Sequence, residues 1–324
     1  MTLTLIQSET LFGQMLDGEM GDAALAKILI DLSDRGETAD EIVGAVRAMR
    51  ARLIQVNAPL NAIDVCGTGG DGLHSLNVST AVAIVVAACD VPVAKHGNRA
   101  ASSKAGGADT LEALGLDLDR ASETAEQTLA DLGIAFLFAQ KHHPALARIA
   151  PIRKGLGRRT IFNLLGPLCN PAGVTRQLVG VPSPALVPLY AQAMAKLGAT
   201  RAMIVSGDEG LDELSISGPS HIATIGFALQ SDVITPEDAG LTRHLPEALK
   251  GGDAAYNATA LRRLLMGEQE TPQDRAYRDA VLLNTAGALI VADEVSDWKA
   301  GVEEAAEAID KGLVKTLLDC WISF

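Results

Sequence analysis

The feature of this 324-residue chain that most constrains its fold is a glycine-rich turn between two apolar runs. The first run, 62–65, is short and strand-like, and the second, 81–88, is apolar throughout and predicts a helix. The turn between them contains Gly67, Gly69 and Gly70, which can adopt positive φ and let the backbone approach a ligand closely. A strand, a glycine loop and a helix in succession are typical of an α/β fold whose loop N–H groups and helix dipole face one anion.

Two details refine this prediction. Ser79 and Thr80 precede the second run and are natural N-cap residues, so we expect the helix to begin there. The glycine spacing matches neither G-x-x-x-x-G-K-[ST] nor G-x-G-x-x-G, the two common phosphate loops. Taken alone, such a turn is more often an ordinary link between strand and helix, and only its neighbours in the sequence favour an anion site.

The segment 95–109 is the neighbour that favours it. It contains two lysines, an arginine, two serines and three glycines, and we expect it to be a mobile, cationic, hydroxyl-rich loop that closes over phosphates. A solvated surface loop is the alternative for the segment taken alone. Its closeness to the glycine turn favours the phosphate cover.

The motifs together resemble those of a known family. The chain reads GTGGD at 67–71, N-x-S-T at 77–80 and KHGNR at 95–99, followed by paired serines, and further matches fall at 143–145, 152–163, 165–171, 210–215 and 278–284. This order resembles the anthranilate phosphoribosyltransferases of tryptophan biosynthesis over nearly the whole chain. One departure is Gly107, which stands where family members usually carry a serine, in GSAD.

The resemblance implies an α/β fold of the nucleoside phosphorylase-like phosphoribosyltransferases. A small all-helical lobe at 1–60, joined by a return segment near 160–178, would accompany a larger α/β lobe at 61–324 with a central sheet flanked by helices. The larger lobe would carry the phosphate and metal sites. The helical lobe would form a homodimer.

The resemblance also implies the ligands and the residues that hold them. Phosphoribosyl pyrophosphate would contact Gly67, Gly70, Asp71, Ser75, Asn77, Val78, Ser79, Thr80, Lys95, His96, Gly97, Asn98, Arg99, Ala100, Ala101, Ser102, Ser103 and Gly107. Anthranilate would contact Gly67, Asn98, His143 and Arg153. Mg²⁺, with two ions per site, would be held by Ser79, Asp212 and Glu213.

The residue types suit these roles. Arg153 can hold a carboxylate with a bidentate fork that lysine cannot reproduce. Adjacent carboxylates at Asp212 and Glu213 suit Mg²⁺, whereas an isolated acidic pair is more often a solvated turn; we expect both to be exposed. A proton-transfer role for His142 or His143 is the less favoured reading, because a histidine outside a recognised motif is more often structural.

The implied reaction is displacement of pyrophosphate from C1 of phosphoribosyl pyrophosphate by the amine of anthranilate. The arylamine is neutral near pH 7, so no general base is expected. Lys95, the loop N–H groups and Mg²⁺ would stabilise the departing charge, which makes catalysis mainly electrostatic.

Composition bears on the partners and the compartment. A net charge of −13 argues against a nucleic-acid surface, because binding there rests on clustered Lys and Arg. Four cysteines without metal-type spacing suit a reducing compartment, and neither a signal sequence nor a membrane-spanning run is evident. We expect a cytoplasmic protein without nucleic-acid or membrane partners.

Two alternatives stay open. A pyrimidine nucleoside phosphorylase would share the fold and a lysine–serine phosphate site, but it should lack the Arg153 and Asn98 constellation and does not need Asp212 and Glu213. A non-catalytic relative that binds nucleic acid should show a basic groove and eroded metal ligands. The sequence favours neither.

The periodicity predicts the surrounding elements. Apolar residues spaced three or four apart at 25–32 and 42–53, with a capping box that begins at Thr38, predict helices in the N-terminal lobe. Strands are predicted at 62–65, 177–181 and 201–205, and helices at 184–197, 275–292 and 298–311. Phe136, Phe138 and Phe162 are expected in the core.

Overall fold

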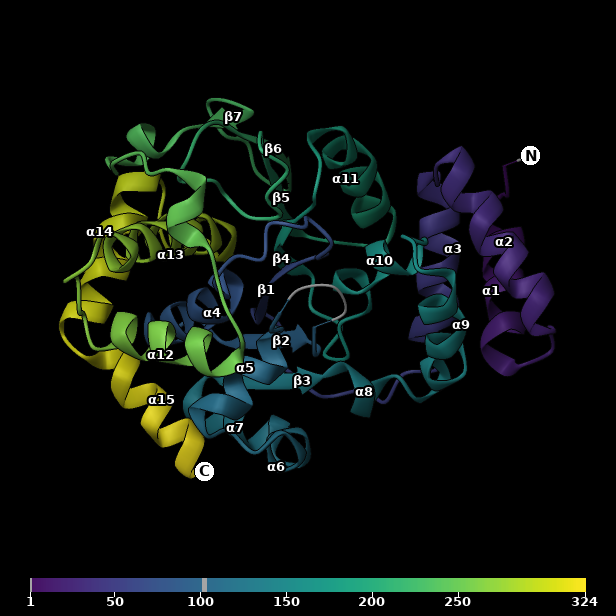
Figure 1. Cartoon of the computed structure of the whole chain (residues 1–324), viewed down its shortest axis with the longest axis horizontal. Coiled ribbons are helices and arrows are strands. Elements are labelled where there is room, and N and C mark those ends of the chain that lie inside the picture. Colours follow the sequence, from purple (N-terminus) through teal and green to yellow (C-terminus); the bar gives the residue numbers. More distant parts are fainter. Residues whose placement is uncertain (1, 101–103) are drawn as a thin grey trace.

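A helical lobe forms one end of the molecule. The computed structural model describes residues 2–100 and 104–324. The lobe, purple at the N-terminus in Figure 1, begins with α1 (Leu5–Asp17), α2 (Asp22–Arg35) and α3 (Ala39–Arg50). The chain later returns to it through η1 (Pro144–Ala147), α9 (Ile149–Leu156), α10 (Phe162–Leu165) and η2 (Pro167–Cys169), each of which contacts one of the first three helices. The residues from 144 to 169 thus pack against the first three helices, and the return segment expected near 160–178 stays a prediction.

The start of α3 is fixed by the capping box that the sequence predicts. The Thr38 hydroxyl accepts from the Glu41 N–H at 3.3 Å, and the Glu41 carboxylate accepts from the Thr38 N–H at 2.9 Å. Arg35 also donates to the buried Glu41 carboxylate at 2.6 Å. This network joins the end of α2 to the start of α3.

The larger lobe is built on one seven-stranded sheet. The strands are ordered β3-β2-β1-β4-β5-β6-β7. The first five are parallel to one another, β6 is antiparallel to β5, and β7 is antiparallel to β6. Their bounds are β1 (Ile63–Gly67), β2 (Val93–Gly97), β3 (Ile134–Phe138), β4 (Arg176–Gly180), β5 (Arg201–Gly207), β6 (Ser220–Ile225) and β7 (Val233–Ile234). The chain adds β2 and β3 on one side of β1 and β4 on the other, so the strand order reverses between β1 and β4. Open α/β sheets bind ligands beyond the carboxyl ends of the strands at such a switch point.

The two faces of the sheet contribute to different cores, because successive side chains in a strand point to opposite faces. Leu178 and Met203 pack with α4 (Val78–Ala88), which is almost wholly buried, and with α13 (Pro272–Ala292). Val179 and Ile204, one residue further along each strand, pack with the helical lobe and α11 (Val187–Lys196). The helical lobe and one face of the sheet therefore share a continuous core.

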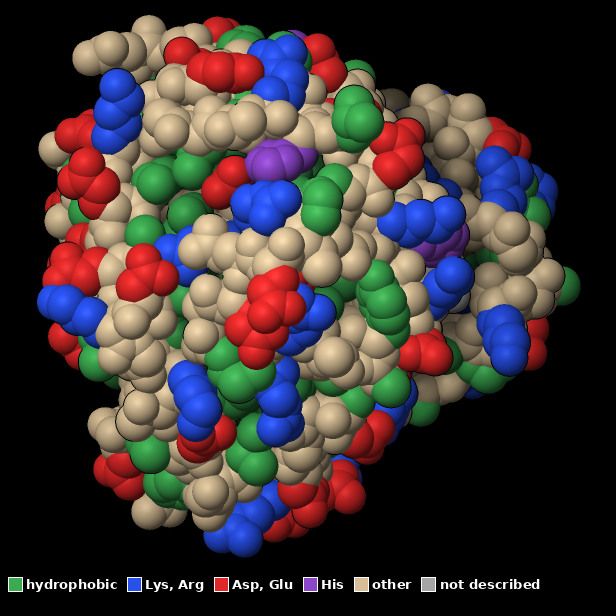
Figure 2. Space-filling view, turned by 60° about the vertical axis from the view of Figure 1, so that its left-hand side comes forward, with side chains coloured by type: hydrophobic (Ala, Val, Ile, Leu, Met, Phe, Trp, Pro, Cys, Tyr) green, Lys and Arg blue, Asp and Glu red, His purple; other side chains and the backbone are tan. Residues whose placement is uncertain are grey.

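The remaining helices surround this core, and several of them pack mainly on other helices (Figure 1). They are α5 (Gly107–Leu114), α6 (Leu118–Glu123), α7 (Ala125–Leu132), α8 (Ala139–His142), α12 (Ala254–Leu265), α14 (Trp298–Asp310) and α15 (Leu313–Ser323), with short 3₁₀ turns η3 (Pro184–Leu186), η4 (Pro236–Ala239) and η5 (Pro246–Leu249). None of the helices within the described ranges is long and apolar enough to cross a membrane. On the face drawn in Figure 2, acidic and basic side chains are interspersed.

Two predictions about the local structure are wrong. Helix α4 begins at Val78 with Asn77 as its N-cap, so Ser79 and Thr80 lie inside its first turn and do not cap it. The segment 95–109 is not a loop throughout: 95–97 belong to β2, and α5 begins at Gly107. The predicted helices and strands elsewhere are found, with ends shifted by a few residues, and Phe136, Phe138 and Phe162 are buried as expected.

Candidate active site

A pocket of about 380 Å³ opens at the carboxyl ends of the strands, where the helical lobe faces the sheet. Its walls contain every described residue that the sequence analysis assigned to a ligand or a metal. They are Gly67, Gly70, Asp71, Ser75, Asn77, Val78, Ser79, Thr80, Lys95, His96, Gly97, Asn98, Arg99, Ala100, Gly107, His143, Arg153, Asp212 and Glu213. Ala101, Ser102 and Ser103 lie outside the described residues.

Asp212 sits at the switch point between the ends of β1 and β4. A Cβ added at Gly67 would lie 2.2 Å from the Asp212 Oδ2, and one added at Gly180 would lie 1.6 Å from the Asp212 carbonyl oxygen. Both strands therefore end in a residue without a side chain, which lets the 212–213 loop cross directly against the sheet. The Gly69 N–H donates to Asp212 Oδ2 at 2.6 Å and ties the glycine turn to this loop.

The acidic pair is buried, which corrects the expectation that it is exposed. Asp212 and Glu213 are 9% and 8% exposed, and the Ser79 N–H donates to Glu213 Oε1 at 3.1 Å. Burial raises the pKa of both carboxyls, and the Asp71 charge raises the pKa of Asp212 further, as the Asp212 charge does for Glu213. The pocket thus holds several carboxylates that repel one another in a low-dielectric setting.

This donor set fits Mg²⁺ bound together with a phosphorylated substrate. Within the described part of the chain, no group of three or more His, Cys, Asp or Glu side chains is arranged to hold a metal by itself. Asp212, Glu213 and the Ser79 hydroxyl are all hard oxygen donors. Mg²⁺ is commonly bound by one or two carboxylates with substrate phosphates and water completing its shell.

Lys95 supplies a fixed positive charge from the sheet. Its side chain lies on β2, is 3% exposed, and donates to the Val65 carbonyl at 2.7 Å and to the Ser79 Oγ at 3.3 Å. The prediction that Lys95 belongs to a mobile cover is therefore wrong. A strand position holds the ammonium group in place, as electrostatic stabilisation of a leaving anion requires.

Asn77 organises the loop before α4. Its Oδ1 accepts from Thr110 at 2.5 Å and from the Asn257 amide at 2.9 Å, and its Nδ2 donates to the Ala105 carbonyl at 3.2 Å. The Tyr277 hydroxyl donates to the Asn77 carbonyl at 3.1 Å. The Asn77 side chain thus bonds to protein groups from α5, α12 and the segment before α5, and it shapes the pocket wall.

Arg153 lies at the other end of the pocket, on α9. Its guanidinium lies over the Phe162 ring at 5.3 Å and donates to Asn163 Oδ1 at 3.5 Å. No carboxylate pairs with it among residues 2–100 and 104–324. Burial lowers the pKa of Arg153, so the pocket contains a partly desolvated cation with an open bidentate face, which suits an anionic carboxylate.

His96 and His143 meet beside this end of the pocket. His96 Nδ1 lies 3.1 Å from the Gly166 carbonyl oxygen, and a carbonyl only accepts, so Nδ1 carries the proton. Its unprotonated Nε2 lies 3.2 Å from His143 Nε2, so a hydrogen bond between the rings requires the proton of His143 to be on Nε2. His143 was assigned to anthranilate and His96 to phosphoribosyl pyrophosphate, and the structure joins them into one pair.

Arg99 is held by carboxylates of the chain itself. Its guanidinium donates to Asp109 at 3.0 Å and to Glu112 at 2.7 and 3.1 Å. The Asp109 carboxylate also accepts from the N–H groups of Ala100 and Gly106, both at 2.9 Å. The two ends of the segment 100–106 are therefore tied to α5.

The sequence analysis gave no ligand role to a further group of pocket residues: Met49, Cys66, Thr68, Gly72, His74, Leu76, Ala105, Gly106, Ala139, Leu146, Phe162, Asn163, Gly166, Pro167 and Cys169. Phe162, Asn163 and Gly166 fall in matched motifs, which was a usable signal. Met49 comes from α3 in the helical lobe, and nothing in its local sequence indicates a pocket.

Comparisons with known proteins agree with this geometry. Residues 60–315 match the family model "Glycosyl transferase family, a/b domain", and residues 2–53 match "Glycosyl transferase family, helical bundle domain". An anthranilate phosphoribosyltransferase of Novosphingobium aromaticivorans is 64% identical over 318 residues, which is 98% of this chain and 95% of the relative.

Solved structures are similar over the same extent. The anthranilate phosphoribosyltransferase from Thermus thermophilus superposes with a TM-score of 0.91 at 41% identity, covering 100% of this chain and 96% of the other. The Saccharomyces cerevisiae enzyme in complex with PRPP (phosphoribosyl pyrophosphate) and Mg gives 0.87 at 29% identity, with 98% and 92% covered. The yeast enzyme in complex with 4-fluoroanthranilate gives 0.88 at 28% identity, with 99% and 93% covered.

Proposed function

The chain belongs to the anthranilate phosphoribosyltransferase family, and from this premise we propose how its pocket residues divide the work of the reaction. The enzyme transfers the 5-phosphoribosyl group of phosphoribosyl pyrophosphate to the amine of anthranilate, giving N-(5-phosphoribosyl)anthranilate and pyrophosphate in tryptophan biosynthesis. The observation that carries the residue roles is the separation of charge in the pocket. Carboxylates and Lys95 lie at the sheet, and the Arg153 guanidinium lies at the helical lobe.

At the sheet, phosphoribosyl pyrophosphate binds against the glycine turn and the start of α4. The N–H groups of this region, the Lys95 ammonium and the Ser79 hydroxyl face the phosphates. Mg²⁺, held by Asp212, Glu213 and Ser79, supplies Lewis-acid stabilisation of charge on the leaving pyrophosphate when it is bound. We propose two ions per site, supported by the excess of carboxylates over cations near Lys95.

At the helical lobe, anthranilate binds with its carboxylate on Arg153. The Phe162 ring packs against the guanidinium and supports it. His143, Asn98 and Gly67 line the pocket between Arg153 and the sheet. This orientation directs the amine toward C1 of the ribose. The amine is neutral near pH 7, so alignment and electrostatics account for the rate without a general base.

We also propose a homodimer that forms through the helical lobe, and a cytoplasmic location. The dimer proposal rests on the membership of the chain in this family. All four cysteines are free thiols, which suits a reducing compartment. Light scattering of the purified enzyme tests the first proposal, and fractionation of the producing cell tests the second.

A direct assay tests the function. The protein is mixed with phosphoribosyl pyrophosphate, Mg²⁺ and anthranilate, and the loss of anthranilate fluorescence is followed. We expect turnover that stops when EDTA removes the metal. A protein that binds Mg²⁺ and stays folded but leaves anthranilate fluorescence unchanged would contradict the assignment.

A further inference from the structure

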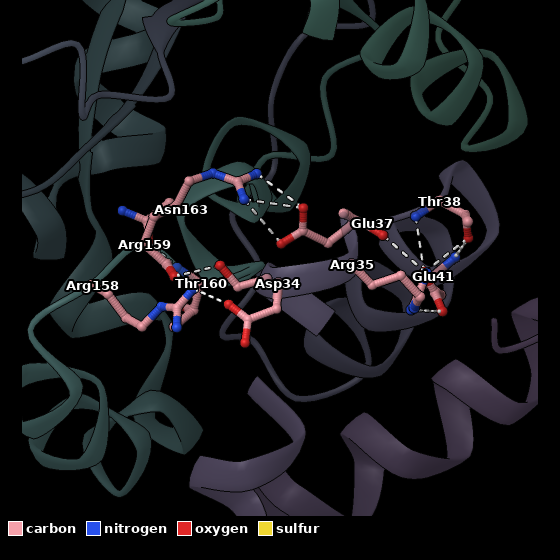
Figure 3. Close-up of polar contacts among 11 residues, drawn as sticks. Asp34, Arg35, Glu37, Thr38, Glu41, Arg158, Arg159, Thr160 and Asn163 are labelled. Carbon is pink, nitrogen blue, oxygen red and sulfur yellow. Dashed lines mark hydrogen bonds and ion pairs between the residues drawn. The ribbon is translucent and has the colours of Figure 1, made fainter. Parts of the chain in front are cut away.

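Two ion pairs join the corner between α2 and α3 to the segment that follows α9 (Figure 3). Arg159 donates from Nη1 to both oxygens of Glu37 and from Nη2 to Oε2, each at 3.1 Å. Beside it, Arg158 pairs with Asp34. The two pairs come from the same two segments and therefore invite direct comparison.

The pairs differ in their surroundings. The Glu37 side chain is 2% exposed and that of Arg159 is 38% exposed, whereas those of Asp34 and Arg158 are 58% and 42% exposed. Exposed pairs contribute little, but a buried carboxylate that loses its partner is left uncompensated. Glu37 and Arg159 therefore hold the two segments together far more firmly than Asp34 and Arg158 do.

The Glu37–Arg159 pair leads directly to the pocket. The Ser33 hydroxyl donates to the Arg159 carbonyl at 3.0 Å, which fixes the backbone beside the pair. The next N–H, that of Thr160, donates to Asn163 Oδ1 at 3.0 Å, and the same oxygen accepts from Arg153 at 3.5 Å. A short chain of contacts thus connects the buried carboxylate of Glu37 to the guanidinium in the pocket.

We propose that Glu37 is a positioning residue for the aromatic acid. It clamps Arg159, and this clamp sets the turn at 159–163, so that Asn163 and Phe162 hold Arg153 with its fork facing the pocket. The inference rests on the proposed role of Arg153 as the carboxylate anchor. A residue of the N-terminal helical lobe would thus affect the binding of anthranilate. The binding of phosphoribosyl pyrophosphate at the sheet would not depend on it.

The test compares Glu37→Gln with the matched control Asp34→Asn in the full-length enzyme. Glu37→Gln should raise the KM for anthranilate about fivefold or more, as expected when a charge-assisted contact is weakened. The KM for phosphoribosyl pyrophosphate should stay within about twofold, because nothing at the glycine turn changes. Asp34→Asn should leave both constants unchanged.

Further variants separate positioning from general damage. Arg159→Gln alters the pair from its more exposed side and should reproduce the selective rise if Glu37→Gln fails to fold. Arg159→Lys keeps the charge without the fork and should recover part of the anthranilate KM. An equal rise in both KM values, or no change in the anthranilate KM, would overturn the inference, whereas a wild-type enzyme inactive with anthranilate would overturn the proposed function instead.

Discussion

His143 Nε2 lies 3.2 Å from His96 Nε2, and the two rings are 5.0 Å apart between centroids. The pair joins the end of β2 to the residue that follows α8, so it locks the pocket wall between the sheet and the helical lobe. Neither ring is more than 8% exposed as a residue. A further proton on either neutral ring would place a buried charge next to Lys95 and His142.

The first prediction follows from the pH response of this pair. Burial lowers the pKa of His96 to about 3 and that of His143 to about 4. The unfolded rings take up protons below about 6.5 while the folded rings do not, so stability falls as the pH falls from about 6.5 toward 4. Each ring should lower the free energy of unfolding by about 2 kcal/mol at pH 5 relative to neutral pH.

The double variant His96→Asn/His143→Asn measures this contribution. Chemical denaturation at pH 7 and at pH 5 should show a smaller loss for the variant than for the wild type. The loss of stability between pH 7 and pH 5 is measured for each protein and then subtracted. The subtraction removes the contribution of the carboxylates, which both proteins contain. The same pH sensitivity in both proteins would show that other groups control acid stability.

The second prediction concerns the acidic pair. Asp212→Asn with Glu213→Gln should reduce kcat by about 100-fold or more, because the charge that holds the metal is lost. Without metal, the melting temperature of the variant should be no lower than that of the wild type, and at pH 8 it should be higher. Burial raises the pKa of both carboxyls, so their ionised forms are unfavourable in the fold, and the variant lacks them. Calorimetry and turnover assays check both parts, and near-normal turnover at ordinary Mg²⁺ would exclude these ligands.

The third prediction concerns Arg153. Arg153→Gln should raise the KM for anthranilate by about tenfold or more and leave that for phosphoribosyl pyrophosphate nearly constant, because one charge-assisted bidentate pair is lost. Lys154→Gln is the matched control, since Lys154 is the next residue on α9 and is exposed. Steady-state kinetics with each substrate varied in turn would assign Arg153 to the phosphate site if both constants rose together.

The fourth prediction concerns Gly107, the first residue of α5. A Cβ there would lie 2.9 Å from the buried Thr80 Oγ1, which is closer than side chains normally approach. Gly107→Ser should therefore destabilise the protein by about 1 kcal/mol, and Thr80→Ala in the same chain should recover part of this loss. A double-mutant cycle by denaturation measures the coupling; additive effects would show that α5 shifts freely to make room.

Sequence reasoning found the pocket but not its construction. The motifs around Gly67, Lys95 and Arg153 are far apart along the chain, and each indicates its ligand by residue type alone. The burial of Asp212 could not be predicted, because it depends on two strands that end in glycine, Gly67 and Gly180, next to each other in the sheet.

The error at Lys95 has a different cause. β2 is only five residues long and ends in Lys-His-Gly, so its polar content hides a buried strand. The start of α4 was misplaced because the N-cap position is occupied by Asn77. The Asn77 side chain makes no capping bond and instead accepts hydrogen bonds from distant elements. In both cases tertiary contacts outweighed the local preference on which the prediction rested.

The pocket has two walls of unequal construction, and this decides where new substrate preferences can arise. At the sheet the wall combines glycine backbone with charged side chains that bond to one another, and Gly67 already fits against Asp212 without room for a methyl group. At the helical lobe the wall includes apolar side chains such as Met49 and Leu146, which can be exchanged singly, whereas Phe162 also supports Arg153. Libraries of variants aimed at bulkier or differently substituted aromatic acids should therefore vary the wall at the helical lobe and leave the phosphoribosyl pyrophosphate site at the sheet unchanged.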